Sequence, residues 1–369
     1  MVKLSRKKPH LLLAALGLGL SFSALAATSS KPETLAPMKI DQAKAELGKR
    51  LFFDKRLSGN AQVACATCHQ PENGYGHPDA LAPGYPGNLH FRNSPSLINT
   101  VYKKTWFHDG RLGTNLNDVT REMITEDYTM NMDMRLMQER LKQDPVYVEM
   151  FKKAYGGEPS NGTVRKAIPE YLKTLTSKNV PYDQNKLTAS AQRGEVLFKD
   201  KAGCAQCHSG ALFSDGKPHN IGTPENFDIF LDPMRHQTFI AFNMFMGNEN
   251  YMNLKRDVGA HVRTHNADGS DVGKFMTPTL RELKYTAPYM HNGTLKTLGE
   301  VIAFYNVGGG EDSNKSDKLK PLNLSVREQK DLLNFLESLS GDPLTGDEHV
   351  WSKEDYNYAP ITNWREAKN

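Results

Sequence analysis

Hydrophobic positions along this chain recur at helical spacing and strand-like alternation is weak, which predicts a mainly α fold with long loops. Ser325 and Glu328 form a capping box ahead of a helix that is expected to stop near Gly341. The apolar face of that helix consists of Leu332, Leu333, Leu336 and Leu339. A second capping box, Thr297 with Glu300, opens another helix. Its apolar face, expected to point inward, consists of Leu298, Val301, Ile302 and Tyr305.

Two helical segments far apart in the sequence end in the same pattern. GKRLFFD at 48–54 and GEVLFKD at 194–200 both read G-x-x-L-F-x-D. Asp41 and Thr188 are the expected N-caps of these two helices. The glycine that opens both segments indicates a place where a helix approaches another backbone closely.

A second pair of blocks repeats with identical intervals. In each block Tyr lies seven positions after Pro, and His lies six positions after Tyr. The first block consists of Pro95, Tyr102 and His108, and the second of Pro278, Tyr285 and His291. Two independent repeats predict a duplicated chain. We expect tandem domains over residues 27–185 and 186–345, followed by an irregular tail over 346–369.

The first 26 residues have the pattern of a secretory signal peptide. A basic start precedes an apolar run over residues 11–25, and Ala24-Leu25-Ala26 fits a cleavage site. The run is shorter than the ~20 residues that a membrane span needs. We therefore expect an exported, periplasmic protein with no membrane span after cleavage.

Cleavage changes the charge balance of the protein. The whole chain has 46 basic and 42 acidic side chains, and the segment over 1–26 carries four basic side chains and no acidic one. The mature chain therefore has 42 of each and a net charge of zero. This balance does not support a nucleic-acid-binding surface.

The four cysteines of the chain all lie in one kind of motif. VACATCH at 63–69 and GCAQCH at 203–208 contain Cys65, Cys68, His69, Cys204, Cys207 and His208. C-x-x-C-H is the pattern of c-type haem attachment, in which two thioethers hold the porphyrin and the histidine is the proximal iron ligand. Disulfides do not require the histidines, zinc ribbons place their pairs closer together, and a thioredoxin-type pair needs a βαβ context. We expect two covalently bound haem c groups.

Beyond these motifs, three longer blocks resemble the bacterial di-haem cytochrome c peroxidase and MauG family. They are NSPSL at 93–97, TPTLRELKYTAPYMHNG at 277–293 and TLGEVIAFYNVGGG at 297–310. The resemblance covers nearly all of the mature chain and implies two cytochrome c-like haem domains. It implies a peroxide-reactive haem on His69 and a six-coordinate haem on His208. It also implies Tyr305 as the distal ligand of the second haem, although the helical spacing alone favours a core tyrosine.

Within the resembled family, tyrosine at position 305 is typical of the MauG-like members, whereas the peroxidases typically have methionine there. The resemblance then implies that hydrogen peroxide oxidises the enzyme by two electrons, which the haem pair stores as a high-valent state. A side chain of a partner protein, often aromatic, would be oxidised in turn. The alternatives are a cytochrome c peroxidase fed by a small cytochrome or copper protein, and a di-haem electron carrier with no enzymatic role.

The distal side of the first haem departs from the family. Family peroxidases can close this face with a loop histidine, whose slot here lies near Tyr85, while His77 and His90 lie in the loop and either is a candidate ligand. In the family phrase F-W-D-G-R the tryptophan slot holds His108, with Trp106 two residues earlier. Either residue is a candidate electron relay, and His108 is equally well explained as a structural, hydrogen-bonded histidine.

The distal carboxylate that helps to break the peroxide O–O bond aligns with Thr129. Glu126 and Asp127 lie close enough in the sequence to substitute for it. The same loop continues with methionines at 130, 132, 134 and 137, which suit either a copper link or adaptable packing around a haem edge, and we favour packing.

The resemblance also implies one calcium ion between the two domains. Its ligands would be Asn93 and the backbone carbonyls of Thr286 and Pro288. Oxygen donors suit calcium, but these three alone would not identify a metal site.

Overall fold

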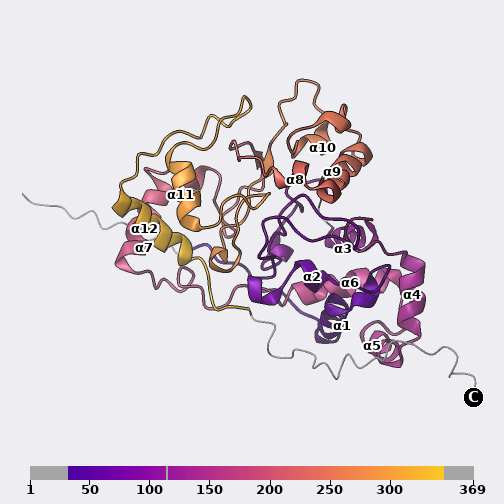
Figure 1. Ribbon diagram of the computed structural model, residues 1–369. Helices are drawn as coiled ribbons and strands as arrows, with labels where there is room; N and C mark the ends of the chain where they lie inside the picture. Colours follow the sequence, from indigo (N-terminus) through magenta and orange to yellow (C-terminus); the bar gives the residue numbers. More distant parts are fainter. Residues whose placement is uncertain (1–31, 114, 345–369) are drawn as a thin grey trace, which may run out of the picture. The chain divides into compact units, whose positions relative to one another are not determined.

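A computed structural model describes residues 32–113 and 115–344, all of which belong to one compact unit. The expected signal peptide over 1–26 and the expected tail over 346–369 lie outside the described residues. Helices and long connecting loops make up the described chain, as the sequence predicts (Figure 1). None of the described helices has the length and apolar character needed to cross a membrane.

The helices follow in two groups along the chain. The first group consists of α1 (Gln42–Phe53), α2 (Cys65–Cys68), α3 (Leu116–Thr125), α4 (Met134–Lys142), α5 (Pro145–Tyr155) and α6 (Asn161–Leu172). The second group consists of α7 (Ala189–Lys199), α8 (Asp228–Leu231), α9 (Pro233–Phe245), α10 (His261–Thr264), α11 (Leu298–Asn306) and α12 (Val326–Glu337). Short 3-10 turns lie at Lys55–Leu57, Pro71–Asn73, Thr100–Tyr102, Cys204–Gln206, Tyr251–Asn253 and Leu283–Tyr285. The described strands, β1 (Pro218–His219) and β2 (Phe275–Met276), pair antiparallel.

The predicted helix starts are confirmed. Asp41 accepts a hydrogen bond from the backbone N–H of Lys44 at 3.2 Å, and Thr188 caps α7 in the same way. Both capping boxes form, at the starts of α11 and α12. Helix α12 ends at Glu337, a few residues before the glycine expected to stop it.

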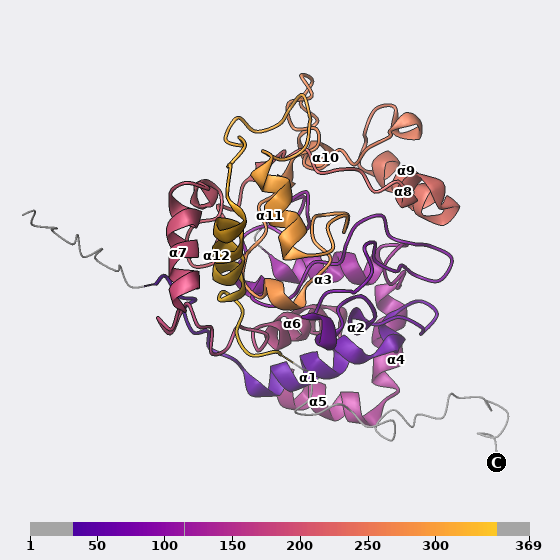
Figure 2. The ribbon, with the colours of Figure 1, turned by 60° about the vertical axis from the view of Figure 1, so that its left-hand side comes forward.

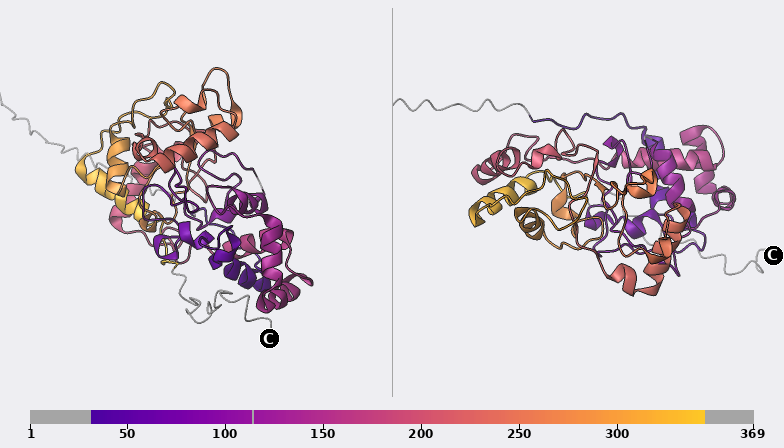
Figure 3. Two further views of the ribbon diagram at one scale, coloured as in Figure 1. Left: turned by 45° about the vertical axis from the view of Figure 1, so that its right-hand side comes forward. Right: turned by 90° about the horizontal axis from the view of Figure 1, so that it is seen from above.

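Each group contains a long helix pair with a glycine at the contact. Helix α1 packs on α6, and α7 packs on α12; the second pair lies side by side in Figure 2 and in both views of Figure 3. A methyl group on Gly48 would overlap the carbonyl oxygen of Ala167. A methyl group on Gly194 would overlap the carbonyl oxygen of Asp331. The predicted close approach of two backbones is therefore confirmed at both glycines.

The buried side chains of the described residues gather in separate clusters, of which the first two follow these groups. One cluster draws on residues 47–175 and includes Met130, Met132 and Met137, so these three methionines serve as core packing. A second cluster draws on residues 198–339 around α7, α11 and α12. A third joins α8, α9 and α10 to the loop that contains Phe91. The common origin of the halves and a domain boundary near residue 185 remain predictions.

Candidate functional site

The first C-x-x-C-H motif opens onto a large cavity. Helix α2 is a single turn, and its first and last residues, Cys65 and Cys68, line the cavity together with His69. The cavity has a volume of about 490 Å³ and a mainly apolar wall that includes Phe52, Ile124 and other core side chains. All four cysteines are free thiols, which excludes the disulfide alternative within the described residues.

Both proximal histidines are oriented by the same kind of hydrogen bond. Nδ1 of His69 donates to the carbonyl oxygen of Tyr75 at 3.1 Å, and Nδ1 of His208 donates to that of Phe213 at 2.9 Å. A proton on Nδ1 leaves the lone pair of Nε2 free for a metal, which is the usual arrangement of a histidine that ligates iron. The two motifs therefore present matching ligands.

Lys103 on the cavity wall supports haem as the occupant. Burial lowers the pKa of its ammonium group to about 8. Within the described ranges, this side chain forms no ion pair and no hydrogen bond. Lys103 is partly buried, and an anionic group in the cavity, such as a haem propionate, would be a suitable partner for its charge. The residues present therefore fit a haem held by Cys65, Cys68 and His69.

The second motif lies in the 3-10 turn Cys204–Gln206, and Tyr305 faces it from α11. Burial, with a smaller effect of the Cys204 and Cys207 thiols, raises the pKa of the Tyr305 phenol. Its hydroxyl makes no hydrogen bond to any described residue, although a buried phenol normally has a partner. This position is compatible with the distal-ligand role that the resemblance implies, and ligation of the second haem by Tyr305 remains a prediction.

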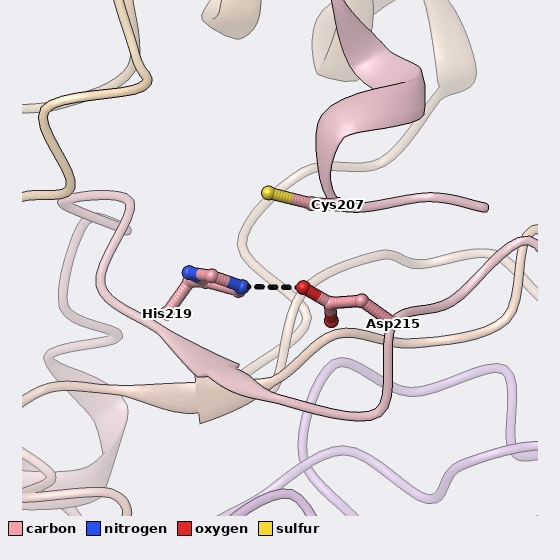
Figure 4. Close-up of side chains that lie close together, drawn as sticks. All are labelled: Cys207, Asp215 and His219. Carbon is pink, nitrogen blue, oxygen red and sulfur yellow. Dashed lines mark hydrogen bonds and ion pairs between the residues drawn. The ribbon is translucent and has the colours of Figure 1, made fainter.

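Cys207, Asp215 and His219 form a compact group beside the second motif (Figure 4). Their potential ligand atoms lie within 4.8 Å of one another, and Nε2 of His219 donates to the Asp215 carboxylate at 2.8 Å. Haem attachment would convert the Cys207 thiol to a thioether, which would leave only two strong donors, Asp215 and His219. We therefore assign this group to the edge of the second haem site and not to a separate metal centre.

The candidate residues for the distal side of the first haem differ in whether they line the cavity. Trp106, His108, Thr129 and His90 line the cavity, whereas His77 and Glu126 do not belong to its wall. The Thr129 hydroxyl donates to the carbonyl oxygens of Met123 and Glu126, at 2.7 and 3.1 Å. Its proton is therefore engaged with backbone. Burial and the nearby Glu122 raise the pKa of the Glu126 carboxyl, which lies at the end of α3.

The two aromatic relay candidates are both hydrogen-bonded to backbone. Trp106 donates from Nε1 to the carbonyl oxygen of Thr100 at 3.3 Å, and His108 donates from Nε2 to that of Asn93 at 3.0 Å. Burial, followed by the charge of Arg92, lowers the pKa of His108 to about 4, so its imidazole is neutral at pH 7. These contacts agree with a structural role for His108 and leave its relay role a prediction.

A buried charge network lies behind His108 and was not anticipated from the sequence. Arg92 forms ion pairs with Asp109 at 2.5 Å and with Asp257 at 2.6 Å, and Arg111 also contacts Asp109. The side chains of Arg92, Asp109 and Asp257 are at most 3% exposed. The network joins the chain around residue 92 to a loop 165 residues later. Its only sequence signal is the H-D-G-R phrase that contains Asp109 and Arg111.

The residues expected to bind calcium lie on segments that are in contact. The backbone N–H of Asn93 donates to the carbonyl oxygen of His291 at 2.7 Å. The side-chain amide of Asn93 donates to the carbonyl oxygens of Asp79 and Ala80, both at 3.2 Å. Its Oδ1 accepts no hydrogen bond from the described residues and is free to act as a ligand. Calcium binding by Asn93, Thr286 and Pro288 remains a prediction.

Comparison with known proteins identifies the family of this chain. The family model described as di-haem cytochrome c peroxidase matches residues 42–192. Cytochrome-c peroxidase IdrP2 of Pseudomonas sp. (strain SCT) is 45% identical over 345 residues, which cover 90% of this chain and 92% of the relative. Methylamine utilization protein MauG of Methylorubrum extorquens is 33% identical, with 87% and 86% of the two chains covered.

A solved structure shares the fold as well. The crystal structure of a MauG-like protein associated with microbial copper homeostasis superposes with a TM-score of 0.72 at 26% identity, over 85% of this chain and 95% of that one. Two haem attachment motifs, matching proximal histidines and relatives that span the chain lead to one assignment. This chain belongs to the di-haem cytochrome c peroxidase and MauG family and is a peroxide-dependent di-haem oxidoreductase.

Proposed function

We propose that this chain is a periplasmic enzyme that consumes hydrogen peroxide at the His69 site and oxidises an aromatic side chain of a partner protein. The observation that carries the proposal is the placement of Tyr305. Its phenol faces Cys204 and Cys207, and within the described chain it has no hydrogen-bond partner. No methionine takes this position on α11.

The identity of the distal ligand sets what the second site can do. A tyrosine phenolate stabilises ferric and higher-valent iron, whereas a methionine thioether favours the ferrous form and raises the potential. With His208 and Tyr305 as its two ligands, the second site would accept electrons poorly from ordinary cytochromes. The same pair of ligands would favour the retention of an oxidising equivalent.

The wall of the cavity brings both halves of the chain together. It includes Trp106 and His108 from the first half, and Leu212 and Asp215 from the segment directly after the second motif. Bound haem supplies the redox chemistry, in which hydrogen peroxide takes up two electrons. A wall shared by the two halves would place the two haem sites near each other, which would support electron transfer between them.

A second candidate function is a cytochrome c peroxidase that draws electrons from a small cytochrome or copper protein. It is favoured by the two relatives that are 45% identical, both named cytochrome-c peroxidase IdrP2. The MauG relatives are 33% and 30% identical.

Steady-state turnover of hydrogen peroxide with a reduced small c-type cytochrome separates the two functions. The proposal predicts slow turnover, together with stoichiometric consumption of one equivalent of peroxide in the absence of donor. Rapid turnover with the cytochrome would instead support the peroxidase function. The matched variant Tyr305→Met tests the cause, because a thioether ligand should increase the rate of electron entry.

A further inference from the structure

His90 is the only one of the two loop histidines that lies on the wall of the first cavity, within the described part of the chain. Its ring stacks on Phe91, with a centroid separation of 5.1 Å, and makes an edge-type contact with Tyr128, with a centroid separation of 5.5 Å. Arg235 of α9 donates a hydrogen bond to the backbone carbonyl of His90. Both the ring and the backbone of His90 are thus held in place.

The hydrogen bond to the His90 ring fixes where its proton lies. The backbone N–H of Arg92 donates to Nδ1 of His90 at 3.0 Å, so Nδ1 acts as an acceptor. Burial, followed by the charges of Arg92 and Arg111, lowers the pKa of His90 to about 3, which keeps the imidazole neutral. A neutral ring with Nδ1 as acceptor carries its single proton on Nε2.

This arrangement is the opposite of that at the two proximal histidines. His69 and His208 donate from Nδ1 to a carbonyl oxygen and present the lone pair of Nε2. His90 presents an N–H at the same ring position and has no lone pair there for iron. Nε2 of His90 forms no hydrogen bond with the described residues, and the residue lies on the cavity wall.

We propose that His90 is a hydrogen-bond donor to an oxygen of hydrogen peroxide in the cavity and is not a ligand of the iron. The proposal rests on the proposed function in one respect, namely that peroxide reacts at the His69 site. A fixed donor stabilises negative charge that develops on oxygen as the O–O bond breaks. This role partly replaces the distal carboxylate, whose position is occupied by Thr129, a residue whose proton is engaged with backbone carbonyls.

The test compares His90→Leu with the matched control His77→Leu in the di-haem protein. His77 also accepts a backbone N–H at Nδ1, from Asp79 at 3.2 Å, but lies off the cavity wall. Fluoride is the probe, because it binds ferric iron and accepts hydrogen bonds from distal donors. The readouts are the ferric EPR spectrum and the fluoride affinity by optical titration.

We expect the first haem to remain high-spin in His90→Leu, with fluoride affinity reduced roughly 10-fold or more, the effect of losing a hydrogen bond to a charged group. His77→Leu should match the wild type, and His90→Gln, which keeps an N–H donor, should recover part of the affinity. A low-spin signal in the wild type that becomes high-spin in His90→Leu would show that His90 is a ligand and overturn the proposal. Unchanged fluoride affinity in His90→Leu would also overturn it. Neither of these two results would change the outcome of the steady-state turnover with reduced cytochrome, which tests the proposed function separately.

Discussion

Replacing Asp257 with asparagine tests the buried charge network that supports the first cavity. The carboxylate of Asp257 accepts from Nε of Arg92 at 2.6 Å and from Nη2 at 2.8 Å, and the side chain is 2% exposed. Removing one partner of a buried ion pair costs roughly 3–5 kcal/mol. Because Arg92 keeps its contact with Asp109, we expect the lower end, a loss of about 3 kcal/mol in the free energy of unfolding.

The assay is thermal unfolding of the di-haem protein at pH 7, followed by far-UV circular dichroism. For a chain of this size, a loss of that magnitude corresponds to a midpoint roughly 4 °C lower. The control is Glu195→Gln, which removes the carboxylate of the surface pair formed with Lys199 at 2.6 Å and should change stability by less than ~0.5 kcal/mol. Equal midpoints for the two variants would refute the reasoning, since burial would then have no effect on the strength of the pair.

The same network predicts a dependence on pH. Burial alone would raise the pKa of the Asp257 carboxyl, but the adjacent Arg92 holds it well below its usual range. A depressed folded-state pKa contributes stability above the unfolded pKa of ~3.9, and this contribution is lost as the pH falls through the folded-state value. The difference in stability between the wild type and Asp257→Asn should therefore narrow below about pH 4. A difference that stays constant from pH 7 to pH 3 would contradict this assignment.

Three further predictions follow from the sites and the helix contacts. Tyr305→Phe should keep both haems attached but change the ferric spectrum of the second one, and an unchanged spectrum would exclude Tyr305 as a ligand. Gly48→Ala should destabilise the protein by roughly 1–3 kcal/mol because its methyl group meets the Ala167 carbonyl, whereas Gly162→Ala in α6, which meets no atom within 4 Å, should be neutral or stabilising. If calcium binds at Asn93, a chelator should lower the unfolding midpoint of the wild type and have less effect on that of Asn93→Ala. The same response in both proteins would argue against a calcium site at Asn93.

Local features of this fold could be predicted from the sequence because they depend on residues close together in the chain. The caps at Asp41 and Thr188 follow from the residues that open each helix. The contacts of Gly48 and Gly194 follow from a repeat that places a glycine at matching points of two helices. Haem attachment follows from a five-residue pattern that occurs twice.

The remaining features depend on contacts between distant segments. The pairing of Arg92 with Asp257 joins residues that no local pattern relates. The difference between His77 and His90 also became apparent only in three dimensions, because both lie in one loop and only His90 lies on the cavity wall. Tyr305 shows the limit most clearly: its helical spacing indicates an inward face but does not say whether that face meets core side chains or a haem.

The most direct test of the central claim is the ferric EPR and optical spectrum of the di-haem protein before and after one equivalent of hydrogen peroxide. Our account predicts one high-spin haem and one low-spin haem that convert to a long-lived, EPR-silent state with a near-infrared absorption band. Two low-spin haems that do not respond to peroxide would contradict it.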